Sequence, residues 1–280
     1  MKKTLLITGG SGYLGSQLIQ AAVTRGWQVY ATYYSRPFSL ISGTALPLNL
    51  RDTDKTRAVI RSIHPQAVIH TACSNRGEQP FAIVPAAMSV ASAAREFNVR
   101  LVHVSSDTVF DGEHAPYTDD APPAPIMGYG HVKTEAEAIV SQVYPPSVIV
   151  RPSLIWGLQP LDHQTRWLVD GIQRGERVTL FSDEYRCPVY IHDLCAALLE
   201  LAAQPALSGP MNLGGAQPVN RWDFGLKLLH QLQVTPGPNL VRGTVKESGL
   251  VRPRDLTMVS ARAARGLNSK LRGVDEVLAA

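Results

Sequence analysis

Short apolar runs and amphipathic segments alternate along the first 150 residues. Strand-like runs occupy Lys3–Thr8, Gln28–Tyr33, Ala67–His70, Leu101–Val104 and Val148–Val150. Between them, apolar positions recur with helical spacing at about residues 12–25, 53–63, 79–97 and 129–143. Buried strands that alternate with helices are typical of a parallel sheet, because each crossover helix carries the chain back to where a parallel strand can begin. The pattern predicts an α/β fold built on a doubly wound parallel sheet.

The pattern changes after Arg151. Shorter elements are separated by glycine and proline residues, and helical spacing returns at Leu194–Ala203 and Arg221–Leu232. The chain has no internal repeat and no low-complexity tract. The sequence therefore predicts a domain over residues 1–150 and a smaller region over residues 151–280, partly interleaved with it, that shapes a second pocket.

Composition excludes several classes of protein. Hydrophobic residues make up 45% of the 280 residues and charged residues 18%, which rules out a mainly disordered chain. No apolar run approaches the roughly 18 residues of a membrane span, and the stretch after Lys3 is too short for a signal peptide. The three cysteines show no CxxC spacing and suit a reducing compartment. We expect a cytoplasmic protein without membrane contact.

The net charge of +4, from 27 basic and 23 acidic residues, narrows the choice of ligand. It equals the local excess over residues 241–280, which hold four acidic residues and eight basic ones: Arg242, Lys246, Arg252, Arg254, Arg262, Arg265, Lys270 and Arg272. No run of five basic residues occurs, which argues against nucleic-acid binding. A small anionic ligand fits this tail, and so does a merely solvated surface.

A glycine-rich loop follows the first predicted strand and opens the first helix. It reads Thr8-Gly9-Gly10-Ser11-Gly12-Tyr13-Leu14-Gly15. Gly9 permits a tight turn, Gly12 allows a pyrophosphate to approach the positive end of the helix, and Gly15 allows the helix to pack on the sheet. A plain strand–helix turn is the alternative. The loop, with Ser11, Tyr13 and Leu14 among its expected ligand contacts, predicts a Rossmann-like dinucleotide site.

The end of the second predicted strand indicates which dinucleotide binds. An NAD-selective site carries a carboxylate there, but Tyr33 is followed by Tyr34, Ser35 and Arg36, and no acidic residue occurs before Asp52. Ser35 and Arg36 can instead bind the 2′-phosphate of NADP(H). An arginine that only faces solvent is the alternative.

Candidate chemistry lies at Tyr129 and Lys133. They are four residues apart in a predicted helix, so they share one face about 6 Å apart. The lysine charge could lower the pKa of the tyrosine from about 10 and make it a proton donor near neutral pH. Ser106, just after a predicted strand, could polarise a carbonyl. A surface pair on a helix is the alternative.

These motifs together resemble the extended short-chain dehydrogenase/reductase family, and the finer resemblance is to dTDP-4-dehydrorhamnose reductase and its relatives. It rests on the glycine loop and on the segments Val104–Gly112, Tyr129–Glu137, Arg151–Gly157, Pro188–Leu194, Met211–Gly215 and Arg252-Pro253. The resemblance implies that Ser106, Tyr129 and Lys133 are catalytic. It also implies reduction of a keto group on a nucleotide-diphosphate sugar by NADPH, with a homodimer left open.

On the same resemblance, further cofactor contacts are expected beyond the glycine loop. They are Asn49, Leu50, Thr71, Ala72, Cys73, Ser105, Tyr129, Lys133 and Arg151. For Cys73 a buried core thiol is the alternative, and for Arg151 a structural salt bridge is an equal one. Arg252 or Arg254 could clamp a diphosphate. The histidines show no metal-site spacing with carboxylates, so we expect no metal.

Several features separate this chain from the pattern it resembles. Pro85 stands where an asparagine is usual, and we expect it to kink its helix. The segment His70–Arg76 replaces an alanine-rich stretch next to the substrate. Two other functions stay open: an epimerase of the same fold, and a non-catalytic NADP-binding subunit resembling the beta subunit of methionine adenosyltransferase. A dehydratase is disfavoured because Asp107 is followed by Thr108 rather than by glutamate.

Overall fold

A parallel seven-stranded sheet forms the centre of the protein, in the order β11-β6-β5-β4-β1-β2-β3. The computed structural model describes residues 3–40, 42–73 and 82–280. The strands are β1 (Thr4–Thr8), β2 (Gln28–Tyr33), β3 (Thr44–Pro47), β4 (Ala67–His70), β5 (Arg100–Val104), β6 (Val148–Pro152) and β11 (Gly209–Leu213). The order of β1 to β6 is that of a Rossmann fold.

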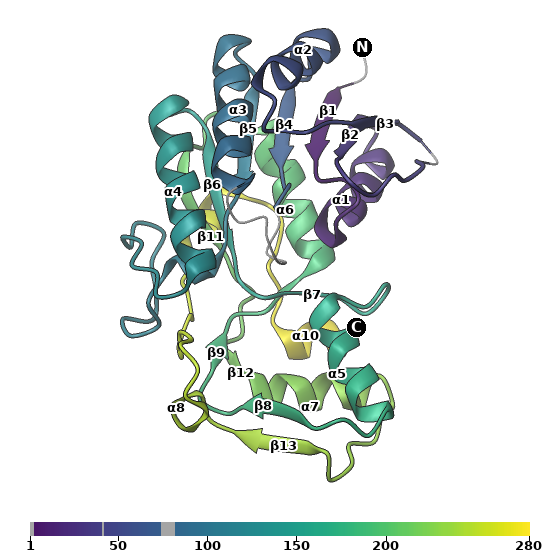
Figure 1. Cartoon of the computed structure of the whole chain (residues 1–280), viewed down its shortest axis with the longest axis vertical. Coiled ribbons are helices and arrows are strands. Elements are labelled where there is room, and N and C mark those ends of the chain that lie inside the picture. Colours follow the sequence, from purple (N-terminus) through teal and green to yellow (C-terminus); the bar gives the residue numbers. More distant parts are fainter. Residues whose placement is uncertain (1–2, 41, 74–81) are drawn as a thin grey trace.

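Helices cover both faces of this sheet (Figure 1). One face carries α1 (Tyr13–Thr24) and α6 (Ile191–Ala203); the other carries α2 (Thr53–Ile63), α3 (Ile83–Glu96) and α4 (Gly128–Val143). Side chains alternate between the two cores along each strand, so that Leu5 and Ile7 pack on the α1 face and Leu6 packs on the α3 face. The predicted doubly wound α/β fold is confirmed.

The sequence analysis did not predict two of the sheet strands, and both lie at edges of the sheet. β3 is short and half-exposed, so it lacks a continuous apolar run. β11 begins Gly209-Pro210, residues that disfavour a strand interior but are tolerated at an edge. Because β11 and α6 come from beyond residue 151, the second half of the chain completes the sheet of the first.

The remaining elements form a smaller lobe and its connections to the sheet (Figure 1). In the lobe, α5 (His163–Gln173) and α7 (Arg221–Gln231) pack on the paired strands β8 (Val178–Phe181) and β13 (Leu240–Gly243) around a core of its own. The other elements are η2 (Asp107–Val109), β7 (Ile155–Trp156), β9 (Tyr185–Arg186), β10 (Val189–Tyr190), β12 (Val219–Asn220), α8 (Val245–Ser248), α9 (Ala261–Gly266) and α10 (Val274–Leu278). No helix within the described ranges is long and apolar enough to cross a bilayer.

The expected kink at Pro85 is wrong. Helix α3 begins at Ile83, so Pro85 stands in its first turn, where the backbone N–H groups have no partner within the helix. The helix then continues to Glu96 without interruption. The missing donor of proline therefore costs this helix no hydrogen bond.

Candidate active site

The glycine loop turns sharply between β1 and α1. Gly9 has a φ of +74°, and a Cβ atom there would lie 2.7 Å from the Cα of Ala72. A Cβ atom at Gly15 would lie 2.2 Å from the carbonyl oxygen of Gly9, so this glycine is required by the loop itself rather than by the sheet. Gly12 caps α1 without a side chain, which leaves the start of the helix open to a ligand.

A cavity of about 320 Å³ opens beside this loop at the carboxyl ends of β1, β2 and β4. Its size and position fit a cofactor site in a doubly wound sheet. Of the residues expected to bind the cofactor, it is lined by Gly9, Ser11, Gly12, Ser35, Arg36, Asn49, Leu50, Thr71, Ala72 and Cys73. The sequence analysis did not assign to the site eight further residues that line it: Thr32, Tyr33, Tyr34, Leu48, Arg51, Ala82, Ile83 and Ala86. Leu48 and Arg51 follow the unpredicted strand β3.

Two exposed arginines, Arg36 and Arg51, line the end of this cavity formed by β2 and β3. The Arg51 Nε donates to Asn49 Oδ1 at 3.2 Å. The nearest carboxylate in sequence, Asp52, is turned to α2, where it accepts from the Lys55 backbone N–H at 3.0 Å. This end of the cavity therefore offers positive charge to an anionic group.

Arg151 has a structural role, and its assignment to the cofactor is corrected. Its guanidinium is buried and donates to Glu137 at 2.7 Å and to the carbonyl oxygens of Asp119 and Ala121. These bonds hold α4 against β6. Tyr13, another expected cofactor contact, donates its hydroxyl to the Pro160 carbonyl at 3.2 Å, across to the smaller lobe.

Tyr129 and Lys133 lie in the first two turns of α4. The Tyr129 hydroxyl lies 3.4 Å from the Cys73 thiol, which lines the cofactor cavity. Lys133 is 2% exposed, and its Nζ donates to the Val104 carbonyl at 2.7 Å. The cavity thus reaches the predicted catalytic pair through Cys73.

The expected lowering of the tyrosine pKa is wrong. Burial raises the pKa of Tyr129 well above 10, and the neighbouring Cys73 and Asp107 act in the same direction. Burial also lowers the pKa of Lys133, against the influence of Cys73 and Glu137. The phenol is therefore held in its protonated form, which is the form that a proton donor needs.

Ser106 belongs to a hydrogen-bonded loop after β5. Its hydroxyl accepts from the Thr108 N–H at 3.2 Å and from the Thr108 hydroxyl at 2.9 Å, and it donates to Asp107 Oδ1 at 3.3 Å. Ser105 is buried, and its hydroxyl has no partner among the described residues. Thr108 is a second hydroxyl at this site that the sequence analysis did not assign.

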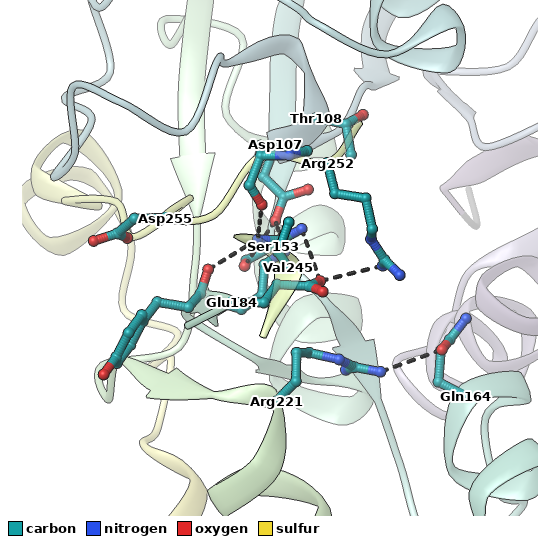
Figure 2. Close-up of polar contacts among 12 residues, drawn as sticks. Asp107, Thr108, Ser153, Gln164, Glu184, Arg221, Val245, Arg252 and Asp255 are labelled. Atoms are coloured by element: carbon teal, nitrogen blue, oxygen red, sulfur yellow. Dashed lines mark hydrogen bonds and ion pairs between the residues drawn. The ribbon is translucent and has the colours of Figure 1, made fainter. Parts of the chain in front are cut away.

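A polar cluster, buried except for the partly exposed Arg252, joins this loop to the smaller lobe (Figure 2). Asp107 accepts from the Ser153 hydroxyl at 3.0 Å, and Arg186 lies 3.7 Å from Asp107 and 3.1 Å from Glu184. Arg252 reaches Glu184 at 3.3 Å. Within the described part of the chain, Glu184 Oε2 and Arg252 Nε have no hydrogen-bond partner, as is expected where a polar ligand completes a site. We call these five residues the interlobe cluster.

The two arginines expected to clamp a diphosphate have different surroundings. Arg252 belongs to the interlobe cluster, where it pairs with Glu184 (Figure 2). Arg254 instead pairs with Glu113 at 3.0 Å, and both side chains are about half-exposed. Across residues 3–40, 42–73 and 82–280, no group of three histidine, cysteine or acidic side chains is placed to bind a metal ion.

The chain is similar to one protein family over almost its whole length and to several known proteins. A family model described as "RmlD substrate binding domain" matches residues 1–276. The methionine adenosyltransferase 2 subunit beta of Danio rerio is 27% identical over 259 residues, which cover 84% of this chain and 78% of that protein. A dTDP-4-keto-6-deoxy-D-glucose reductase of Streptomyces niveus is 28% identical over 242 residues, or 83% and 80%.

Solved structures agree on the fold. The crystal structure of dTDP-4-dehydrorhamnose reductase from Bacillus anthracis, in complex with NADP, superimposes with a TM-score of 0.86. The match covers 100% of this chain and 98% of that one at 21% sequence identity. A likeness at this identity supports the architecture and leaves substrate choice to the residues of the site.

Proposed function

The chain belongs to the RmlD substrate binding domain family, and from this premise we propose that it is an NADPH-dependent reductase of a keto group on a nucleotide-linked sugar. The observation that carries the proposal is that the cofactor cavity connects with the predicted proton donor. A cavity suited to a dinucleotide reaches Cys73, and the Cys73 thiol contacts the hydroxyl of Tyr129. Cofactor and proton donor would thus meet at one point, at the carboxyl ends of the strands.

The residues around the cavity fit NADPH. Gly9 and Gly12 leave space where a side chain would obstruct the start of α1, and the helix end favours a pyrophosphate. Ser35, Arg36 and Arg51 would bind the 2′-phosphate. The nicotinamide, when bound, supplies the hydride.

The protein's own groups would manage the proton and the carbonyl. Tyr129 is held protonated by burial, so it can donate to the carbonyl oxygen as negative charge develops there. Lys133 is fixed by Val104 at the base of the site and adds positive charge behind the tyrosine. Ser106, with Thr108 as a second hydroxyl, would hydrogen-bond the carbonyl oxygen.

The interlobe cluster would bind the nucleotide-diphosphate part of the substrate. The cluster holds two arginines, Arg186 and Arg252, and two carboxylates, Asp107 and Glu184. The adjacent Arg221, which donates to Gln164 at 3.2 Å, adds a third positive charge and leaves the region with a net charge of +1 (Figure 2). Guanidinium groups bind phosphates with two parallel hydrogen bonds. The incompletely bonded Arg252 is the group best prepared for this contact.

The deciding experiment follows NADPH oxidation at 340 nm with a panel of nucleotide keto-sugars, including a dTDP-4-keto-6-deoxy sugar. We expect oxidation with at least one member and none with Tyr129→Phe under the same conditions. An epimerase would instead interconvert substrates without net loss of NADPH. No turnover with any keto-sugar, despite tight NADPH binding, would contradict a reductase.

A second candidate is a non-catalytic regulatory subunit. The observation that favours it is the 27% identity to a methionine adenosyltransferase 2 subunit beta over most of the chain. Its test mixes the protein with a methionine adenosyltransferase catalytic subunit and measures complex formation by sedimentation, together with the catalytic rate. A stable complex with an altered rate, and no NADPH oxidation, would favour this candidate over the reductase.

A further inference from the structure

The Cys73 thiol is placed differently from the other two thiols of the chain. Cys187 and Cys195 are buried, whereas Cys73 is exposed and lines the cofactor cavity. Its Sγ lies 3.4 Å from the Tyr129 hydroxyl. Among the described residues, this thiol is the one hydrogen-bond partner of that hydroxyl. Cys73 therefore stands between a half-buried phenol and the open cavity.

Charged and titratable groups surround this pair from each neighbouring element. Lys133, on α4, interacts electrostatically with Cys73, and Asp107, in η2, interacts electrostatically with Tyr129. Behind Lys133 lie the buried imidazoles of His70 on β4 and His103 on β5, and Glu137 lies further along α4. Burial lowers the pKa of both histidines, so neither carries charge at neutral pH. Of these groups, Cys73 is the one that lines the cavity.

This arrangement bears on how the phenol regains its proton. A phenolate left after donation would lie beside Asp107 in a partly desolvated site, which is costly. Thiols are in general stronger acids than phenols, so a thiol in contact with a phenolate can pass its proton to it. Cys73 also reaches solvent through the cavity once the cofactor has left.

We propose that Cys73 is a proton relay for Tyr129, an inference that rests on the proposed reduction. As the O–H bond of Tyr129 breaks and its proton passes to the substrate oxygen, the S–H bond of Cys73 breaks and its proton passes to the phenolic oxygen. The thiolate then takes a proton from water entering the vacated cavity. One hydride from NADPH and one proton from solvent are consumed for each alcohol formed, so the cycle balances.

The test compares wild type with Cys73→Ser and Cys73→Ala. Serine retains a proton that can be transferred, whereas alanine has no such proton. The measurement is the single-turnover rate of NADPH oxidation from pH 6 to pH 10, so that product release does not mask the step. NADPH affinity is measured in parallel and the rates are compared at saturating NADPH, because Cys73 itself lines the cofactor cavity.

We expect Cys73→Ala to lower the rate about tenfold at pH 7, the loss of one hydrogen bond to a developing charge. Cys73→Ser should recover most of this loss. The ratio of the wild-type rate to the Cys73→Ala rate should also vary across this pH range, because only wild type carries the thiol. Rates within twofold of each other at every pH would overturn the relay while leaving the reductase intact.

A measurement independent of turnover covers the case in which no keto-sugar is reduced. Because Cys73 is the exposed thiol, its alkylation by iodoacetamide can be followed by mass spectrometry. Removing its partner with Tyr129→Phe should change the alkylation rate at least threefold. Tyr144→Phe, at the far end of α4, is the matched control and should leave the rate unchanged. Equal rates in all three proteins would overturn the Cys73–Tyr129 pair itself.

Discussion

Arg36→Ala should erode the preference for NADPH over NADH. Arg36 and Arg51 line the cavity where β2 ends without a carboxylate, and both are exposed. A hydrogen bond to a charged group contributes about 1.5–3 kcal/mol, and solvent screening places an exposed arginine at the lower end. This corresponds to about tenfold weaker NADPH binding, with NADH binding nearly unchanged because NADH lacks the 2′-phosphate.

The assay is a fluorescence titration of both cofactors against wild type, Arg36→Ala, Arg51→Ala and the double variant. Arg25→Ala, at the end of α1, is the surface control. The double variant should lose about a hundredfold if the two arginines act independently, and the wild-type preference should shrink at high salt. Equal or tighter NADH binding by wild type, or an equal loss for both cofactors in Arg36→Ala, would refute the reasoning.

Other predictions concern the proton donor, the substrate and acid stability. Tyr129→Phe should lower turnover by about 10²–10⁴-fold with cofactor affinity nearly intact, and more than a tenth of wild-type activity would remove it from that role. Lys133→Ala should weaken both turnover and NADPH binding, in contrast to the tyrosine variant. Arg252→Ala should raise the KM for the nucleotide sugar about tenfold with little change in kcat; an unchanged KM would make its cluster purely structural. Burial lowers the pKa of His70 from 6.5 to about 3, so the unfolded chain takes up a proton between these values that the folded chain refuses. The contribution of His70 to the free energy of unfolding should therefore fall as pH drops below 6.5, by roughly 2–3 kcal/mol at pH 4.5, and urea titrations should show a smaller fall in His70→Asn but not in the exposed control His131→Asn.

The residues that the sequence analysis assigned to the cofactor site and that line the cavity are placed there by local features of the chain. Gly9, Ser11 and Gly12 line the cavity because a glycine-rich turn between a strand and a helix has few conformations. Ser35 and Arg36 line it because they directly follow β2. The catalytic roles of Ser106, Tyr129 and Lys133 stay predictions, but the structure does bring Tyr129 to the cavity through Cys73.

The errors arose where the packed structure, and not the neighbouring sequence, sets the surroundings of a residue. Arg151 has the charge of a phosphate ligand, yet Glu137 and two carbonyl groups satisfy it inside the core. Tyr129 has a lysine four residues away, yet burial outweighs that neighbour and raises its pKa. Arg51 follows an edge strand too short to show in the sequence, so its place in the cavity could not be foreseen.

The sequence by itself determined the doubly wound sheet, the turn at the glycine loop and the helical spacing of Tyr129 and Lys133, because each follows from periodicity or from backbone freedom over a few residues. The tertiary structure decided which charges are neutralised, which thiol meets the phenol and where the second half of the chain completes the sheet. These depend on burial and on contacts made only in the packed molecule, such as that between Cys73 and Tyr129, which are 56 residues apart in the chain. Electrostatic environment is a property of the packed molecule, so no local pattern can encode it.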